Sequence, residues 1–153
     1  MNKFMKSAIK QAEAGIKNNE GGPFGSVVVK DGKIVGEGHN QVLKNADPTC
    51  HGEIQAIRDA CAKLGSHDLS GCVLYTTGEP CPMCLSACLW ANIEKIYYGC
   101  TIADNERIGF RDKVFYEMLG GKAGVTPDYL ECIDRDECIA LFSKYAEMDK
   151  EIY

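Results

Sequence analysis

The chain has 153 residues, 45% of them hydrophobic, which is enough for one folded domain spanning residues 1–153. Its net charge of -5 argues against a nucleic-acid partner, whose phosphates call for a basic surface. No stretch is long enough to cross a bilayer or is typical of a signal peptide, and nine cysteines, an odd number, indicate a reducing cytoplasm more than a disulfide scaffold.

The first forty residues predict a helix followed by a β-hairpin. Residues 2–19 place apolar side chains on one helical face and lysines on the other. Residues 25–30 are rich in β-branched side chains, and Asp31-Gly32 is a strong signal for a tight hairpin turn. Residues 33–38 should therefore return as an antiparallel strand, before a polar loop.

The rest of the chain alternates helices and strands. The predicted elements are a helix from His51 to Leu64 ended by Gly65, a strand at 72–77, a helix at 82–91, a strand at 95–99, a mixed segment at 101–127, a strand at 128–133 and a helix at 135–149. Strands joined through a helix should run parallel. This order predicts an α/β fold of three layers, α/β/α, with a five-stranded mixed sheet.

Two short motifs carry the chemistry. His51-Gly52-Glu53 is followed by Glu79-Pro80-Cys81-Pro82-Met83-Cys84, and together they have the pattern of the zinc deaminases that act on nucleobases. A catalytic zinc takes three protein ligands and leaves its fourth position to water, which then ionises near pH ~7. We expect His51, Cys81 and Cys84 to bind one Zn²⁺ per chain.

Glu53 is expected to move protons beside this metal without binding it. Because it lies two residues after His51, it can reach the water that completes the metal shell. Pro82 suits the first position of a helix, and thiolates are favoured at a helix N-terminus. Two helix N-termini, opened by His51 and by Cys81, are therefore expected to face one another.

Other interpretations of these cysteines stay open at this point. A Cys-x-x-Cys pair also occurs as a redox pair, as half of a structural zinc site, or as two buried cysteines. A structural zinc is closed by four protein ligands, and Cys50 or Cys88 would have to supply the fourth. In a closed site Glu53 would have no purpose. Ligand softness favours zinc, and iron remains an alternative.

Further motifs identify the chain as similar to a known superfamily. They are Gly22-Pro23-Phe24-Gly25, Asn40, Asp47-Pro48-Thr49, Trp90-Ala91, Gly109-Phe110-x-Asp112 and a terminal Tyr153. With the zinc motifs, they make the chain resemble the cytidine-deaminase-like superfamily nearly end to end. Within it, the chain resembles the bacterial guanine deaminases.

The resemblance implies roles for five further residues. Asn40 would hydrogen-bond the edge of a purine, and Phe24 and Trp90 would flank the base. Asp112 would contact the amidine face of the ring and help to move a proton to the leaving amine. Tyr153 would help to close the pocket, from a C-terminal segment exchanged between the two subunits of a homodimer.

One position departs from the family pattern. The family usually has alanine or valine where this chain has Gly52. The backbone N–H of Gly52, which can bind the base, survives the change, and the missing methyl group is expected to leave extra room in the site.

The expected reaction is hydrolytic deamination of a small purine substrate, guanine to xanthine and ammonia. The alternatives are a tRNA adenosine deaminase, a deaminase of cytosine, isocytosine, a triazine or a nucleoside, and a non-catalytic zinc domain. The acidic C-terminal region repels phosphate and argues against the tRNA substrate. No membrane association is expected.

Overall fold

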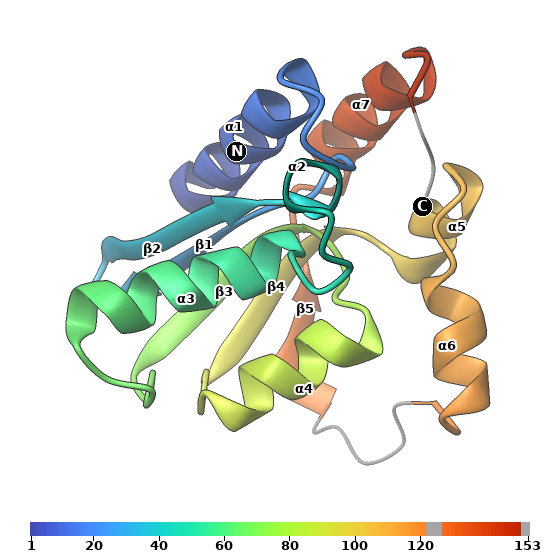
Figure 1. The fold of residues 1–153 in the computed structure, drawn as a ribbon. Coiled ribbons are helices and arrows are strands. Elements are labelled where there is room, and N and C mark those ends of the chain that lie inside the picture. The colour runs from blue at the N-terminus through green and yellow to red at the C-terminus, as the bar shows by residue number, and fades with distance from the viewer. Residues whose placement is uncertain (122–126, 151–153) are drawn as a thin grey trace.

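The computed structural model describes residues 1–121 and 127–150, which fold around one five-stranded sheet (Figure 1). The strand order is β2-β1-β3-β4-β5, with β1 antiparallel to both neighbours and β3, β4 and β5 parallel. The strands are β1 Gly25–Lys30, β2 Lys33–His39, β3 Cys72–Gly78, β4 Lys95–Cys100 and β5 Leu130–Cys132. The predicted five-stranded mixed sheet is confirmed.

The hairpin between β1 and β2 turns at the two residues that the sequence indicated. Asp31 and Gly32 both have positive φ, 49° and 72°, which is the backbone of a two-residue hairpin turn of type I′. The ladder then pairs Lys30 with Lys33.

Four helices cover the two faces of the sheet and complete the three predicted layers. The helices α1 (Lys3–Lys17) and α7 (Arg135–Ala146) lie on one face, and α3 (Gly52–Leu64) and α4 (Pro82–Trp90) lie on the other (Figure 1). None of the helices within 1–121 and 127–150 is long and apolar enough to cross a membrane.

The core follows the two-residue alternation of the central strands. Val28 and Leu74 pack on the side of α3 and α4, whereas Val27 and Tyr75 pack on the opposite side. All four side chains are less than a tenth exposed. The sheet is therefore buried on both faces, and functional groups are left to the ends of the strands.

Some element boundaries differ from the predicted ones. A short helix, α2 (Val42–Asn45), interrupts the predicted polar loop, and the mixed segment holds α5 (Ile102–Arg107) and α6 (Asp112–Met118). The last strand is only three residues long, because the 3-10 turn η1 (Pro127–Tyr129) occupies the start of the predicted one. The helices α5 and α6 follow the carboxyl end of β4 (Figure 1).

Candidate active site

Two helix N-termini meet at the carboxyl end of β3. His51 is the N-cap residue of α3, and Cys81 is the N-cap residue of α4 with Pro82 in the first turn, as predicted. Both caps have extended backbone, with ψ of 158° and 168°, so the side chains precede the first helical turn. At the far end of α3, Gly65 takes the left-handed conformation that terminates the helix.

The three predicted metal ligands converge. The Nδ1 atom of His51 lies 3.6 Å from Sγ of Cys81 and 3.5 Å from Sγ of Cys84. One ligand atom from each residue lies within 4.8 Å of the others, and all three cysteine and histidine side chains are at least partly buried. Tetrahedral zinc with ordinary Zn–N and Zn–S bonds requires an N···S separation of about 3.6 Å, so the donor set fits this metal.

A closed, four-ligand site disagrees with the geometry, and the approach of His51 to both sulfur atoms favours a metal site over a redox pair. The thiols of Cys81 and Cys84 are free. Cys50 turns away to accept hydrogen bonds from Asn45 and Arg58, and Cys88 is fully buried in the apolar core against α3 and β3. Within the described part of the chain, no fourth protein ligand joins the cluster.

The space left beside the three ligands has the size of a water molecule. A cavity of about 30 Å³ is lined by His51, Glu53 and Cys81, and by Phe24, Asn40, Glu79, Phe110 and Asp112. A space of this volume holds one water, and the polar groups around it are those that such a water needs. The cluster therefore has the open fourth position of a catalytic metal site.

Glu53 lies in the first turn of α3 and is 5% exposed. Burial and the nearby Cys81 thiolate raise the pKa of Glu53 to about 7, while the charge of His51 opposes this shift. A carboxyl group whose pKa lies near neutrality can both take and release a proton during turnover.

The cysteine thiols differ in their protonation. The hydrogen bond from Cys84, with the support of His51, lowers the pKa of Cys81 to about 4 against the effect of burial. Burial, the hydrogen bond to Cys81 and the charges of Glu53 and Cys81 raise the pKa of Cys84. Burial also opposes protonation of His51, but Cys81, Glu53 and Asp112 outweigh it and raise its pKa. Cys81 is thus already a thiolate at neutral pH, whereas Cys84 would lose its proton only when a metal ion binds.

Asp112 begins α6 and faces both the small cavity and a wider cleft. Burial and the Cys81 thiolate raise the pKa of Asp112, and a hydrogen bond from Asn105 opposes the shift. The wider cleft has a volume of about 400 Å³ and is lined mainly by apolar side chains, from Pro48, Pro82, Met83, Phe115, Met118 and Leu119. A volume of this size is typical of small-molecule sites.

Phe24 and Asn40 lie in the small cavity as expected. The Phe24 ring meets the Phe110 ring edge-on, with centroids 4.8 Å apart. The Asn40 side chain is 1% exposed, and its Oδ1 accepts a hydrogen bond from the N–H of Val42 at the start of α2. Asn40 therefore caps a turn and lines the cavity at the same time.

The extra room expected at Gly52 is absent, and that expectation is wrong. A Cβ on Gly52 would lie 2.8 Å from the carbonyl oxygen of Phe24, which is closer than such atoms approach. The backbone carbonyl group of Phe24, just before β1, occupies the space that a methyl group would need. Gly52 thus permits close contact between α3 and the segment that carries Phe24.

Trp90 does not lie where the resemblance placed it, so its predicted role beside the base is not supported within this chain. It is the last residue of α4 and is 86% exposed, on a surface shared with Ser86 and Leu89. It lies eight positions after Pro82, about 12 Å along the helix axis, and therefore far from His51, Cys81 and Cys84. Tyr153 lies outside the described residues.

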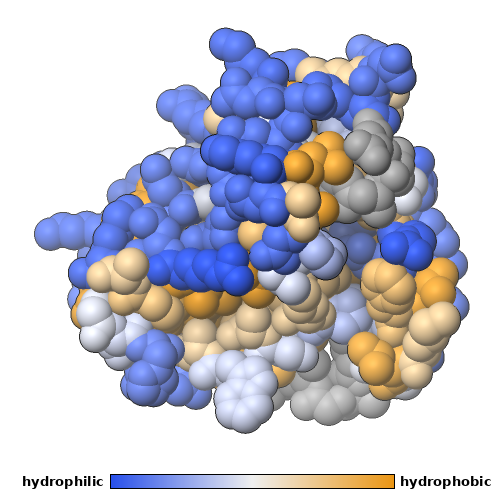
Figure 2. Space-filling view, viewed as in Figure 1, coloured by the Kyte–Doolittle hydropathy of each residue, from blue (hydrophilic) through white to orange (hydrophobic). Residues whose placement is uncertain are grey.

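Residues without a predicted role also line the site. Glu79 and Phe110 face the small cavity, and Figure 2 shows further hydrophobic side chains gathered over α6, beside the wider cleft. Glu79 and Phe110 belong to the motifs that mark the family resemblance, so the sequence did carry a signal for them.

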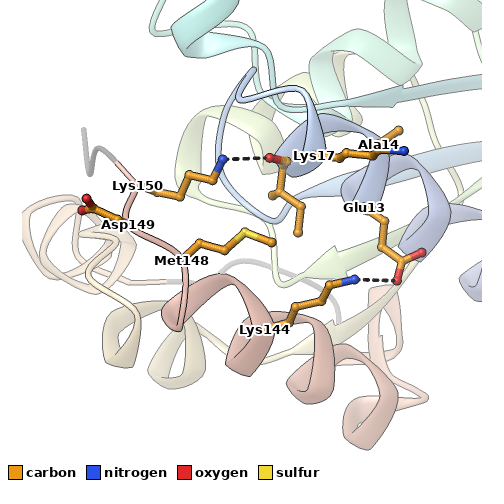
Figure 3. Close-up of a pocket in the computed structure, with 8 residues that line it drawn as sticks. Glu13, Ala14, Lys17, Lys144, Met148, Asp149 and Lys150 are labelled. Carbon is orange, nitrogen blue, oxygen red and sulfur yellow. Dashed lines mark hydrogen bonds and ion pairs between the residues drawn. The ribbon is translucent and has the colours of Figure 1, made fainter.

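A larger hollow of about 710 Å³ lies away from these residues, between the ends of α1 and α7 (Figure 3). Two of its three lysines are engaged locally: Lys144 pairs with Glu13, and Lys150 donates to the carbonyl oxygen of Ile16. It contains none of the predicted site residues.

A histidine and two cysteines beside a buried glutamate, on a mixed sheet of this order, define the class of zinc-dependent deaminases. Residues 1–100 match the family model of the cytidine and deoxycytidylate deaminase zinc-binding region, and the chain belongs to this family.

Individual relatives are similar over most of the chain. The guanine deaminase of Bacillus subtilis is 46% identical over 116 residues, which are 76% of this chain and 74% of that protein. Its X-ray structure superposes with a TM-score of 0.75 at 38% identity, covering 100% of this chain and 99% of the other. A solved structure in complex with 2,6-diaminopurine gives a TM-score of 0.83 at 28% identity, covering 98% and 83%. A tRNA-specific adenosine deaminase of Aquifex aeolicus is 41% identical over 96 residues, 63% of each chain.

Proposed function

We propose that this chain catalyses the zinc-dependent hydrolytic deamination of a free purine base, guanine, to xanthine and ammonia. The observation that carries the proposal is a three-ligand donor set that opens onto a water-sized cavity beside a buried glutamate. The similarity to a guanine deaminase over three quarters of the chain supports guanine as the base.

In this proposal, His51, Cys81 and Cys84 hold one zinc ion per chain. When bound, zinc lowers the pKa of a coordinated water so that hydroxide is available near neutral pH. The two thiolates balance the charge of the cation, and the N-termini of α3 and α4 favour the thiolate form of Cys81.

Glu53 moves the proton of the attacking water. Burial raises the pKa of Glu53 to about 7, and a dication held by the neighbouring ligands would favour its carboxylate form, which is the form that takes a proton from water. Glu53 takes the proton as the oxygen bonds to ring carbon C2, and then delivers it to N3. Glu53 next takes the proton of the new hydroxyl group at C2, and a proton from Glu53 or Asp112 reaches the amino group. The C2–N bond then breaks as the C2 carbonyl group forms, and ammonia leaves.

Three groups would orient the base. Phe24 offers an aromatic ring, Asn40 a buried amide, and Gly52 a backbone N–H at the N-terminus of α3. A homodimer, with Tyr153 of an exchanged C-terminal segment closing the pocket, completes the proposal. The wide apolar cleft beside α6 is consistent with a cover from another chain.

We also propose that residues 1–153 act as one catalytic domain in the cytoplasm, in the breakdown or salvage of purines. Nine free cysteines support a reducing compartment.

The test is ammonia release by the zinc-loaded protein from guanine, cytosine, adenosine and guanosine, and from a tRNA anticodon stem-loop. We expect turnover of guanine alone. Turnover of any of the others with none on guanine would refute the proposal. Turnover of the stem-loop would favour the tRNA-specific class instead, although eight of the eleven charged residues at 128–153 are acidic.

A further inference from the structure

Asn105 is a fully buried residue of α5 that joins two parts of the site. Its side-chain nitrogen donates to Oδ2 of Asp112 at 3.0 Å and to the backbone carbonyl oxygen of Glu79 at 3.3 Å. Glu79 stands two residues before Cys81, so a single amide group links the cysteine loop to the carboxyl group on α6. Nothing in the sequence pattern marks this residue.

The surroundings decide which end of the Asn105 amide is the nitrogen. A backbone carbonyl oxygen can only accept a hydrogen bond, so the atom that faces Glu79 O has to be the donor. The same nitrogen then donates its second hydrogen to Asp112. As a consequence, Oδ2 of Asp112 always acts as an acceptor, and a proton on this carboxyl group is carried by Oδ1.

The other end of the amide is left without a partner. Among the described residues, Oδ1 of Asn105 is a buried atom that accepts no hydrogen bond. A Cβ on Gly78, at the end of β3, would lie 3.1 Å from this oxygen, so the glycine leaves room for it. An unsatisfied buried acceptor costs stability. Its presence indicates that Asn105 is placed here for its two donor hydrogens.

The elements around Asn105 are anchored so that the bridge is rigid. The neighbouring Asp104 is buried and accepts hydrogen bonds from Arg135 of α7, which fixes α5 to the main body. On α6, the hydroxyl group of Tyr116 donates to the carbonyl oxygen of Pro80 at 2.5 Å. The cysteine loop is thus held by α5 and α6 together.

We infer that Asn105 is a positioning residue that acts through Asp112, fixing its carboxyl group so that Oδ1 carries the proton for the leaving amine. The inference rests on the proposed deamination. Asn105 does not itself line the small cavity, and of the two lining residues that it holds, Glu79 is bound only through its backbone carbonyl oxygen. Its effect on turnover should therefore pass through the carboxyl group of Asp112.

A double-mutant cycle tests this coupling. The variants are Asn105→Ala, Asp112→Ala and the double variant, each checked for zinc content and thermal unfolding. Asn105→Ala should lower kcat on guanine about ten- to hundredfold, as expected for the loss of one charge-assisted hydrogen bond, with little change in KM. In the Asp112→Ala background the same substitution should change kcat less than about twofold.

An equal loss of kcat in both backgrounds, or no loss in the wild-type background, would overturn the inference, because either result removes Asp112 as the intermediary. If Asn105→Ala does not fold, Asn105→Leu keeps a similar volume, removes both donors without adding a charge and should give the same cycle. A crystal structure of the folded variant adds a readout that needs no turnover: Asp112 should leave its present rotamer, and an unmoved Asp112 would refute the bridge. Absence of wild-type activity on guanine would refute only the proposed function, and the variant structure would still decide on Asn105.

Discussion

His51 and Cys81 are the N-cap residues of two different helices, and their Nδ1 and Sγ atoms lie 3.6 Å apart although 30 positions separate them in sequence. Both helices direct the positive ends of their dipoles at the same point. The positive potential at this point stabilises anions and disfavours a cation without anionic ligands. Two thiols that become thiolates supply the negative charge that a metal ion would need here. The electrostatics of the site therefore suit a metal whose charge is balanced by its ligands.

Metal binding should depend on Cys84 and not on Cys88, one helical turn later. Cys84→Ser removes a thiolate ligand and should weaken zinc binding more than about a hundredfold. Cys88→Ala, the matched control, should keep one zinc per chain and lose only about 1 kcal/mol of unfolding free energy, because Cys88 lies in the apolar core. Zinc per chain, measured by atomic absorption after dialysis, checks both. Loss of zinc from the Cys88 variant alone would contradict the three-ligand site.

Glu53→Gln should separate metal binding from turnover. The amide has nearly the same shape but cannot take a proton from water, so kcat should fall by a factor of about 10² to 10⁴ while zinc content is unchanged. Glu117→Gln, on the exposed side of α6, is the matched control and should leave kcat unchanged. Ammonia release and zinc content are measured on the same samples. Full activity in the Glu53 variant would remove the carboxyl group from the mechanism.

Gly52→Ala should disturb the site although alanine is the usual residue of the family. The new methyl group would press on the carbonyl oxygen of Phe24, so the segment before β1 has to shift. We expect a higher KM for guanine and a loss of about 1 to 3 kcal/mol in unfolding free energy.

The control for Gly52 is a second glycine of the same helix. Gly65→Ala strains the left-handed cap at the far end of α3 and should cost about 1 kcal/mol, with KM unchanged. Chemical denaturation and steady-state kinetics on both variants provide the comparison. An unchanged KM in the Gly52 variant would contradict this prediction, because it would show that the Phe24 segment can make room for the methyl group without disturbing the site.

The convergence of His51, Cys81 and Cys84 could be predicted from sequence because local signals place these residues. Pro82 fixes the start of α4, Gly65 marks the end of α3, and the ligand spacing fits a helix that begins at each cap. The hairpin at Asp31-Gly32 was equally local, since two residues with positive φ decide its turn. Each of these features depends on neighbours only a few residues away.

The predictions that were wrong, and the contacts that were not predicted, depend on packing between segments that are distant in the sequence. The place of Trp90 follows from the length and direction of α4, and the fit of Gly52 follows from the path of the chain before β1. Asn105 meets Glu79, 26 positions away, only because β3 and β4 run parallel and end side by side. No pattern within one segment could reveal these contacts.

Asp104 should contribute stability that depends on pH. Its buried carboxyl group accepts hydrogen bonds from Thr101 at the start of α5 and from Arg135 of α7. Burial alone would raise its pKa, but these bonds and the guanidinium charge outweigh that effect and hold the pKa below its usual value. A lowered pKa stabilises the fold above the unfolded-state pKa of about 4, and this stabilisation is lost as the pH falls through the folded-state pKa.

Asp104→Asn therefore should lower the unfolding free energy by about 2 kcal/mol at pH 7, and the difference from wild type should shrink below about pH 4. Glu13→Gln is the control, because Glu13 and Lys144 form a half-exposed ion pair at 3.8 Å whose loss should cost less than about 0.5 kcal/mol. Urea unfolding at several pH values measures both differences. If the difference in unfolding free energy between wild type and Asp104→Asn stays constant from pH 7 to pH 3, the carboxylate charge has no part in joining α5 to α7. The position of α5, and with it that of Asn105, would then depend on packing and not on this ion pair.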